Sequence, residues 1–164
     1  MRLWHKDLIE VLPRQQLVAQ WRECCCIAKN LAENGTPNHI LVNRILEYTS
    51  EHFTEYCLSI HKEMIRRGYR PKRFSRNALI DNILKADSKG TFGMCYSESL
   101  FEYWHNDRYF WQCYYNLEEK FDCGGILKSE FDPIRELALK KHGTKLHGTV
   151  LGMEDFQKEP IWKQ

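Results

Sequence analysis

Arg22 and Glu23 are neighbours of opposite charge in a segment with helical periodicity. Apolar residues recur there at steps of four and three, which predicts one buried stripe of Leu17, Trp21, Cys24, Ala28 and Leu31. At the helical turn per residue, Arg22 lies about 140° from that stripe and Glu23 about 120° on the other side. The helix thus presents groups that bind phosphate and transfer protons, although an ordinary solvated face fits as well. Polar side chains flank the pair: Gln15, Gln16 and Lys29.

A basic stretch between Lys62 and Arg76 is the second candidate for chemistry. Seven basic residues are opposed there by one acid, Glu63, and Tyr69 and Phe74 interleave with them. The stretch fits a phosphate-contacting patch, and it also fits a solvated helix end followed by a loop. The basic residues are Lys62, Arg66, Arg67, Arg70, Lys72, Arg73 and Arg76.

Helices must position these residues, and the sequence predicts five of them. Their starts are marked by Pro13, by Thr49 or Ser50, by Ser75 or Arg76, by Asn106 or Asp107, and by Asp132-Pro133. Glycines or turn residues near 34, 68, 90, 124 and 143 end them. The later core faces are Phe53, Cys57, Ile60 and Met64; Leu79, Ile83 and Leu84; and Phe110, Tyr114, Leu117 and Phe121.

The fold class that follows is all-α: a compact single-domain helical bundle with long loops. No strand alternation stands out, the first twelve residues read as extended or irregular, and so do the last twenty or so. With 164 residues, one domain over 1–164 is expected, in which the chain after about residue 125 is an extension.

Composition narrows the setting. The chain is 43% hydrophobic, lacks an apolar run of membrane-spanning length and starts without a signal peptide, so we expect a cytoplasmic protein without a membrane partner. Seven cysteines, three of them consecutive at Cys24–Cys26, read as free thiols. The sequence has no Cys-x-x-Cys pair of the kind that is typical of structural zinc sites, so no metal ligand is predicted. Net charge is only +2, so the distribution of charge matters more than the sum.

The segment from Gln15 to Glu23 resembles the signature helix of the endonuclease V-type pyrimidine-dimer DNA glycosylases, approximately Asp-Gln-His-Leu-x-Ala-Glu-Tyr-Arg-Glu near the N-terminus. The run from Glu63 to Tyr69 resembles the family's Glu-x-x-x-Arg-Gly-aromatic helix end. Met1-Arg2 resembles the family's nucleophile followed by arginine. The similarity extends over roughly the first 70 residues.

The resemblance implies an all-α enzyme without a cofactor that acts as a monomer on damaged double-stranded DNA. Its nucleophile would be the α-amine of Met1, and Glu23 would be the catalytic carboxylate. An α-amino group ordinarily has a pKa of about 7.7–8.0, so a useful fraction is neutral near pH 7 and can form a Schiff base with the sugar. The resemblance implies phosphate contacts by Arg2 and Arg22. Together with the polar face of the first helix and the basic stretch, it gives the full set of expected DNA contacts: Arg2, Gln15, Gln16, Arg22, Lys29, Arg66, Arg67, Arg70, Lys72 and Arg73.

The chain departs from the family's pattern in four places. The basic residue just after the family's glutamate is absent, because Cys24–Cys26 occupy that stretch, and Lys29, one turn further on, is the candidate to replace it. The bulk of Arg2 should keep Met1 on the chain, where family members expose threonine. The family's helix histidine is replaced by Gln16 or Leu17, and its aromatic-basic C-terminal segment has its nearest counterpart at residues 103–111. Two other functions stay open: a nucleic-acid-binding protein that has lost the chemistry, and a thiol- or metal-based protein built on Cys24–Cys26.

Aromatic and histidine residues have a plainer interpretation. Trp104, Tyr109, Trp111 and Tyr115 can stack on a base, but core packing is the commoner role of such residues. His5 lies near the amine and could tune it or contact a phosphate, but an ordinary surface residue is the expected interpretation.

Overall fold

The computed structural model describes residues 1–142, 145–146 and 149–150. Over these residues the chain forms five α-helices, two 3₁₀ helices and one pair of two-residue strands. The all-α fold class expected from the sequence is confirmed. No helix in this part of the chain is long and apolar enough to cross a membrane.

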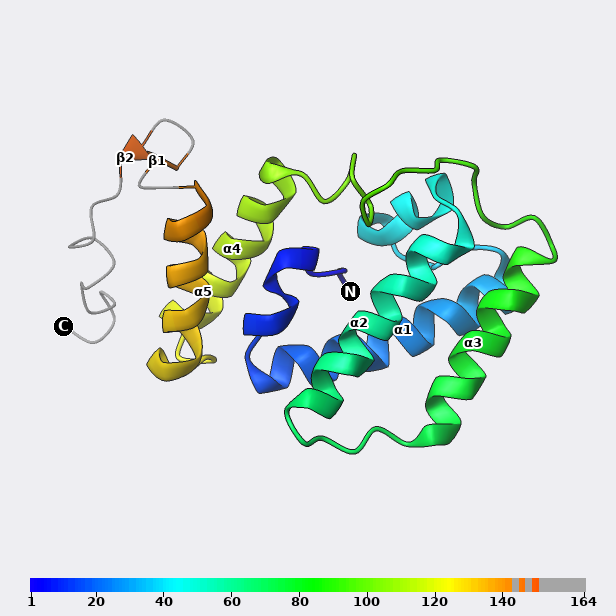
Figure 1. Ribbon diagram of the computed structural model, residues 1–164, viewed down its shortest axis with the longest axis horizontal. Helices are drawn as coiled ribbons and strands as arrows, with labels where there is room; N and C mark the ends of the chain where they lie inside the picture. Colours follow the sequence, from blue (N-terminus) through cyan, green and yellow to red (C-terminus); the bar gives the residue numbers. More distant parts are fainter. Residues whose placement is uncertain (143–144, 147–148, 151–164) are drawn as a thin grey trace.

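Two groups of helices lie on either side of the N-terminal segment (Figure 1). In one group, α1 (Arg14–Asn34) packs against α2 (Ser50–Arg66) and α3 (Arg73–Asp87); in the other, α4 (Asp107–Asp122) packs against α5 (Lys128–His142). The 3₁₀ helix η1 (Lys6–Val11) contacts both α2 and α5. The beginning of the chain therefore joins the two groups.

The helical stripes form the core much as their spacing predicts. The predicted core faces of α1 and α2 are buried throughout, and α1 ends at Gly35, whose φ of 68° gives the left-handed C-cap that glycine adopts readily. On α3, Leu79 and Ile83 are buried, but Leu84 is 61% exposed, so its assignment to the core was wrong. One residue further along a helix turns the side chain by about 100°, which carries Leu84 off the face of Ile83.

Two 3₁₀ helices and one helix start were not predicted. η1 occupies part of the segment expected to be irregular, and η2 (Ile40–Glu47) follows the loop after α1. Helix α5 begins at Lys128, not at Asp132-Pro133, so Pro133 lies inside it. Glu130 explains the earlier start, because its carboxylate accepts a hydrogen bond from the Leu127 amide at 3.4 Å and so caps the first turn.

The connection from α3 to α4, residues 88–106, crosses back over η2. The amide of Cys95 donates to the Glu47 carbonyl at 3.0 Å. Gly93 approaches so closely that a β-carbon there would lie 2.5 Å from the same carbonyl oxygen, so only glycine fits. After α5, strands β1 (Lys145–Leu146) and β2 (Thr149–Val150) pair antiparallel. Most of the last twenty residues, expected to be irregular, lie outside the described residues.

Candidate active site

The first residues of the chain are bound to α1 through main-chain hydrogen bonds. The amide of Arg2 donates to a carboxylate oxygen of Glu23 at 3.2 Å, and the amide of Trp4 donates to the Gln20 side-chain oxygen at 3.0 Å. Gln20 is fully buried although it is polar. Sequence reasoning missed this residue, although its position at the edge of the apolar stripe, three residues after Leu17, was a signal that could have indicated it. The two contacts fix the backbone at Arg2 and Trp4, and Arg2 is the residue next to the terminal amine.

The same segment is bound from its other side by two tyrosines. Tyr56 of α2 donates its hydroxyl to the Trp4 carbonyl at 2.8 Å, and Tyr109 of α4 donates to the Leu3 carbonyl at 2.5 Å. Burial is the main reason that the pKa of each hydroxyl is raised, so both stay protonated donors. Leu3 is fully buried and Trp4 nearly so. Both helix groups therefore position the start of the chain.

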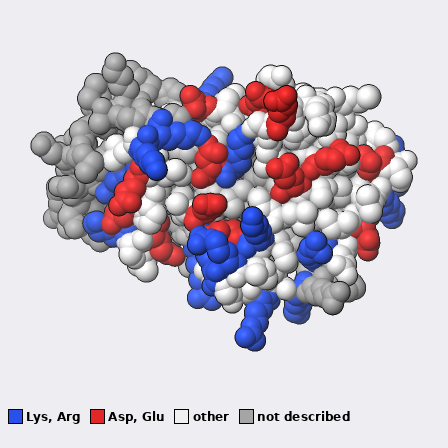
Figure 2. Space-filling view, viewed as in Figure 1, with Lys and Arg blue, Asp and Glu red and all other residues white. Residues whose placement is uncertain are grey.

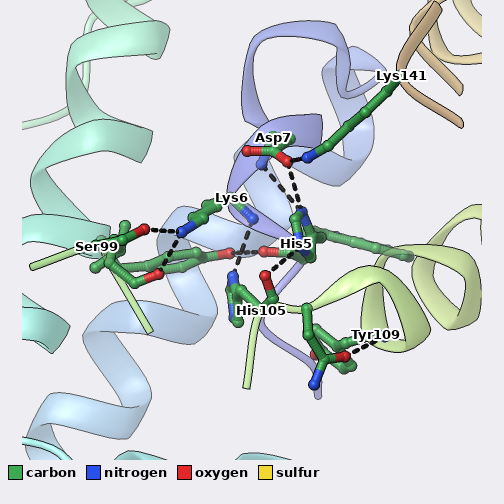
Figure 3. A network of polar contacts seen from close by, with 11 residues as sticks. His5, Lys6, Asp7, Ser99, His105, Tyr109 and Lys141 are labelled. Atoms are coloured by element: carbon green, nitrogen blue, oxygen red, sulfur yellow. Dashed lines mark hydrogen bonds and ion pairs between the residues drawn. The ribbon is translucent and has the colours of Figure 1, made fainter. Parts of the chain in front are cut away.

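A pair of buried histidines continues this anchor (Figure 3). The His5 ring lies against the His105 ring with centroids 5.2 Å apart, and His5 Nε2 is 2.8 Å from the His105 carbonyl oxygen. The Lys6 amide donates to His105 Nδ1 at 3.0 Å. Burial, then His5 and nearby cations, holds the pKa of His105 well below its ordinary value, so the ring is neutral and can accept this bond. The interpretation of His5 as a surface residue was wrong, since it is 1% exposed.

A pocket of about 800 Å³ opens where the chain begins. It lies against the polar face of α1 that the helical spacing predicts. Of the predicted site residues, six line it: Met1, Arg2, Gln15, Gln16, Arg22 and Glu23. The structure thus brings the proposed nucleophile, the proposed carboxylate and four of the expected DNA contacts into one site.

Residues that sequence reasoning missed complete the pocket. Arg14 precedes the signature on α1, Leu41 comes from η2, and Asn116 and Lys120 come from α4. Lys120 is about a hundred positions from Glu23 in the sequence, and only folding brings them together. The cations lining the pocket are the terminal amine, Arg2, Arg14, Arg22 and Lys120, and Glu23 is the acid among the lining residues. Such an excess of positive charge favours a polyanion.

Lys29 does not line this pocket. It lies further along α1, is exposed, and has its ammonium group 3.9 Å from the Glu33 carboxylate. It can meet a nucleic acid only beyond the pocket itself.

Two of the predicted contacts at the end of α2 are engaged within the protein. Arg66 and Arg67 each hold a carboxylate oxygen of the buried Glu63 at 2.6 Å. Arg67 also donates to the main-chain carbonyls of Leu12 at 2.6 Å and Glu10 at 2.8 Å. The Arg67 side chain is 19% exposed, whereas that of Arg66 is 64% exposed. Arg67 therefore joins α2 to the end of η1, and Arg66 keeps a face toward solvent.

Of the rest of the basic stretch, Arg70 and Lys72 lie in the connection from α2 to α3, whereas Lys62 belongs to α2 and Arg73 and Arg76 to α3. Arg70 and Lys72 are exposed, and the side chain of Arg73 lies outside the described residues. The Arg14 guanidinium lies 5.6 Å from the centre of the Tyr69 ring, which links this connection to the pocket. Figure 2 shows basic side chains gathered in the lower middle of the molecule, where α2 ends, with acidic ones beside them.

The cysteines and most of the aromatic residues considered for chemistry have no contacts that indicate a catalytic or metal-binding role in the described part of the chain. All seven cysteines are free, and no group of three or more potential metal ligands converges among the described residues. Trp104 and Trp111 are buried in the core, as expected, while Tyr115 is 38% exposed.

Comparison with known proteins gives one family. Residues 1–77 match the family model described as pyrimidine dimer DNA glycosylase, which confirms the resemblance predicted from the sequence. The matched part spans the N-terminal segment, α1, α2 and the start of α3, and so contains Met1 and Glu23 but not Lys120. Neither the curated proteins nor the solved structures compared with the chain gave a match.

Proposed function

We propose that this protein is a DNA glycosylase with AP-lyase activity on duplex DNA that carries pyrimidine dimers or related damage. The observation that carries the proposal is the hydrogen bond from the Arg2 amide to Glu23, within a pocket that Met1 also lines. A terminal amine, a carboxylate and several cations in one pocket are the groups that this chemistry requires. The family match supports the same conclusion.

In the proposed reaction, the neutral amine of Met1 attacks C1′ of the damaged nucleotide. A bond forms from the amine nitrogen to C1′, the glycosidic bond breaks, and the base leaves with the bonding electrons and takes up a proton. Nitrogen loses a proton, the C1′–O4′ bond of the sugar ring breaks, and O4′ takes up a proton, which leaves a protonated imine between nitrogen and C1′. Removal of a C2′ proton then breaks the C3′–O bond and releases the 3′ phosphate.

Glu23 has two roles in this scheme. Its negative charge stabilises the positive charge that develops on the sugar and then on the imine nitrogen, and its oxygens relay protons during ring opening and elimination. Because the Arg2 amide fixes one of these oxygens, the carboxylate is positioned before substrate arrives. Preorganisation of this kind avoids reorganisation during the reaction.

The cations around the pocket hold the DNA backbone in this proposal. Arg2 and Arg22 contact phosphates beside the damaged nucleotide, with Gln15 and Gln16 as neighbouring hydrogen-bonding groups. The backbone continues past Arg14 and Tyr69 toward the end of α2. The outer contacts would be Lys29, Arg66, Arg70, Lys72 and Arg73, whereas Arg67 is taken up by Glu63 and by main-chain carbonyls.

Borohydride trapping on DNA with an abasic site tests the proposal, because reduction of the imine leaves a stable covalent adduct. We expect the wild-type protein to be trapped and Glu23→Gln to lose about 100-fold or more of the trapping rate. Glutamine keeps an oxygen that can accept the Arg2 amide, so the variant removes the charge and preserves the anchor. Glu33→Gln, on the same helix but outside the pocket, is the matched control.

A Gly-Ser extension ahead of Met1 tests the nucleophile. It moves the amine by up to about 7 Å along the chain and should abolish trapping. Intact mass of the wild-type protein must first show that Met1 is retained. Trapping that survives the extension would assign the nucleophile to a side chain, and Lys120 of the same pocket is then the residue to replace. Salt-sensitive DNA binding without any trapping would leave a non-catalytic binding protein.

A further inference from the structure

Two large apolar side chains stand exposed at the beginning of η2. Ile40 is 81% exposed and Leu41 is 51% exposed, while Val42 and Ile45 of the same helix are fully buried. A single exposed aliphatic residue is ordinary on a protein surface. Two in succession, on a helix whose inner face is anchored in the core, form a small apolar projection.

The projection lies at the edge of the candidate active site. Leu41 lines the pocket that contains Met1 and Glu23. Ile40 and Leu41 also line a second pocket of about 320 Å³, together with Arg44 and Arg108. Leu41 therefore forms the ridge between the two hollows.

The backbone that carries this ridge is held in place. Asn38 adopts a left-handed φ of 60°, and the next residue, His39, accepts the Leu41 amide through its ring nitrogen at 3.3 Å. At the other end of η2, the Glu47 carbonyl is held by the Cys95 amide in the connection from α3 to α4. The two side chains are thus presented on a fixed turn.

Cations flank the ridge on both sides. Arg2 and Arg22 lie in the active-site pocket, and the exposed Arg108 lies in the second one. The Arg44 guanidinium lies 6.0 Å from the centre of the Trp104 ring and pairs with Glu47 at 3.2 Å. An apolar ridge between two cationic hollows matches the cross-section of a nucleic acid, in which stacked bases lie between charged backbones.

We propose that Ile40 and Leu41 are a wedge that enters the base stack of the duplex beside the nucleotide held in the Met1–Glu23 pocket. The proposal rests on the proposed function and adds a positioning role to it. Opening a base step costs free energy. Covering the exposed aliphatic surface of the wedge with bases offsets part of that cost.

The test compares trapping on two forms of the same abasic strand, paired in a duplex and single-stranded. A wedge acts only where a stack has to be opened. We therefore expect Ile40→Ala/Leu41→Ala to lower the duplex rate about tenfold more than the single-strand rate. Leu41→Met, which keeps a large apolar side chain, should keep the ratio of the duplex rate to the single-strand rate close to that of the wild-type protein. Leu84→Ala, an exposed leucine on α3 away from both pockets, is the matched control and should leave the ratio unchanged.

A fluorescent base analogue opposite the abasic site gives a second readout. Wild-type binding should raise its fluorescence as the base unstacks, and the double variant should not. Equal losses of trapping on both strands would overturn the wedge while leaving the proposed function intact. A double variant that changes the oligomeric state but not the ratio would also overturn it, in favour of a protein contact. Absence of wild-type trapping on either strand would instead defeat the proposed function.

Discussion

The two basic regions of this molecule differ in what their charges face. In the pocket at the start of α1, four cationic side chains and the terminal amine surround one carboxylate, and Arg22 is exposed. At the end of α2, the buried Glu63 and two main-chain carbonyls take up Arg67 and part of Arg66. We infer from the comparison that clustered basic side chains form an anion site only where acceptors within the protein leave some of their positive charge uncompensated.

Replacing Glu63 should give the largest effect, and the effect should be on stability. Glu63→Gln leaves two arginines facing a neutral group, which we expect to lower the free energy of unfolding by about 2–3 kcal/mol in chemical denaturation. Glu23→Gln should change it by no more than about 0.5 kcal/mol. Equal losses for both variants would remove the distinction between the regions.

The loss of unfolding free energy in Glu63→Gln should also depend on pH, because the lost carboxylate is itself titratable. Burial alone would raise the pKa of Glu63, but hydrogen bonds and charge from Arg66 and Arg67 outweigh it, so the pKa is lowered from its ordinary 4.5. A lowered carboxyl pKa contributes stability that is complete above the unfolded value and disappears as pH falls through the folded value. The gap between wild type and Glu63→Gln should therefore narrow below about pH 4.5.

Replacing Arg22 and replacing Arg67 should have different effects on DNA binding. We expect Arg22→Ala to weaken binding to damaged duplex about tenfold and to flatten the plot of log affinity against log salt by about 0.9. Arg67→Ala should leave that slope unchanged and lower stability instead. Titrations at several salt concentrations measure both, and a slope change in Arg67→Ala equal to that in Arg22→Ala would place the two regions on one DNA path.

Arg70 should give the smallest effect of the series. It is exposed in the connection after α2, so Arg70→Ala should weaken binding only about threefold, again with a flatter salt dependence. Lys85→Ala, exposed near the far end of α3, is its control. A slope that Arg70→Ala leaves untouched would confine the DNA contacts to the pocket.

Local periodicity was enough to predict the helices and one wall of the site. The stripe of α1 is buried as its spacing predicts, and Arg22 and Glu23 fall off it together because a helix fixes the angle between neighbours. The 3₁₀ helices escaped prediction because short elements carry little periodic signal. Nothing in the local sequence could indicate Lys120, Tyr109 or His105, which reach the start of the chain only through tertiary packing.

The segment that matches the family model does not position the start of the chain alone. Within it, Glu23, Gln20 and Tyr56 bind residues 2 and 4. Tyr109 and His105, which bind the Leu3 carbonyl and the Lys6 amide, lie beyond it. The second group of helices thus contributes to positioning as well as to the core.

The way the first residues are bound also restricts which sequences can occupy them. The partners of α1 hold main-chain amides of residues 2 and 4, not the side chains of these residues. The side chains have separate tasks, since Trp4 is buried in the core and the Arg2 guanidinium donates to the Gln112 carbonyl at 3.3 Å. Proline fails at either position whatever its side chain could pack against, because it has no amide hydrogen to offer Glu23 or Gln20. Related sequences that keep these two contacts should accordingly exclude proline at positions 2 and 4.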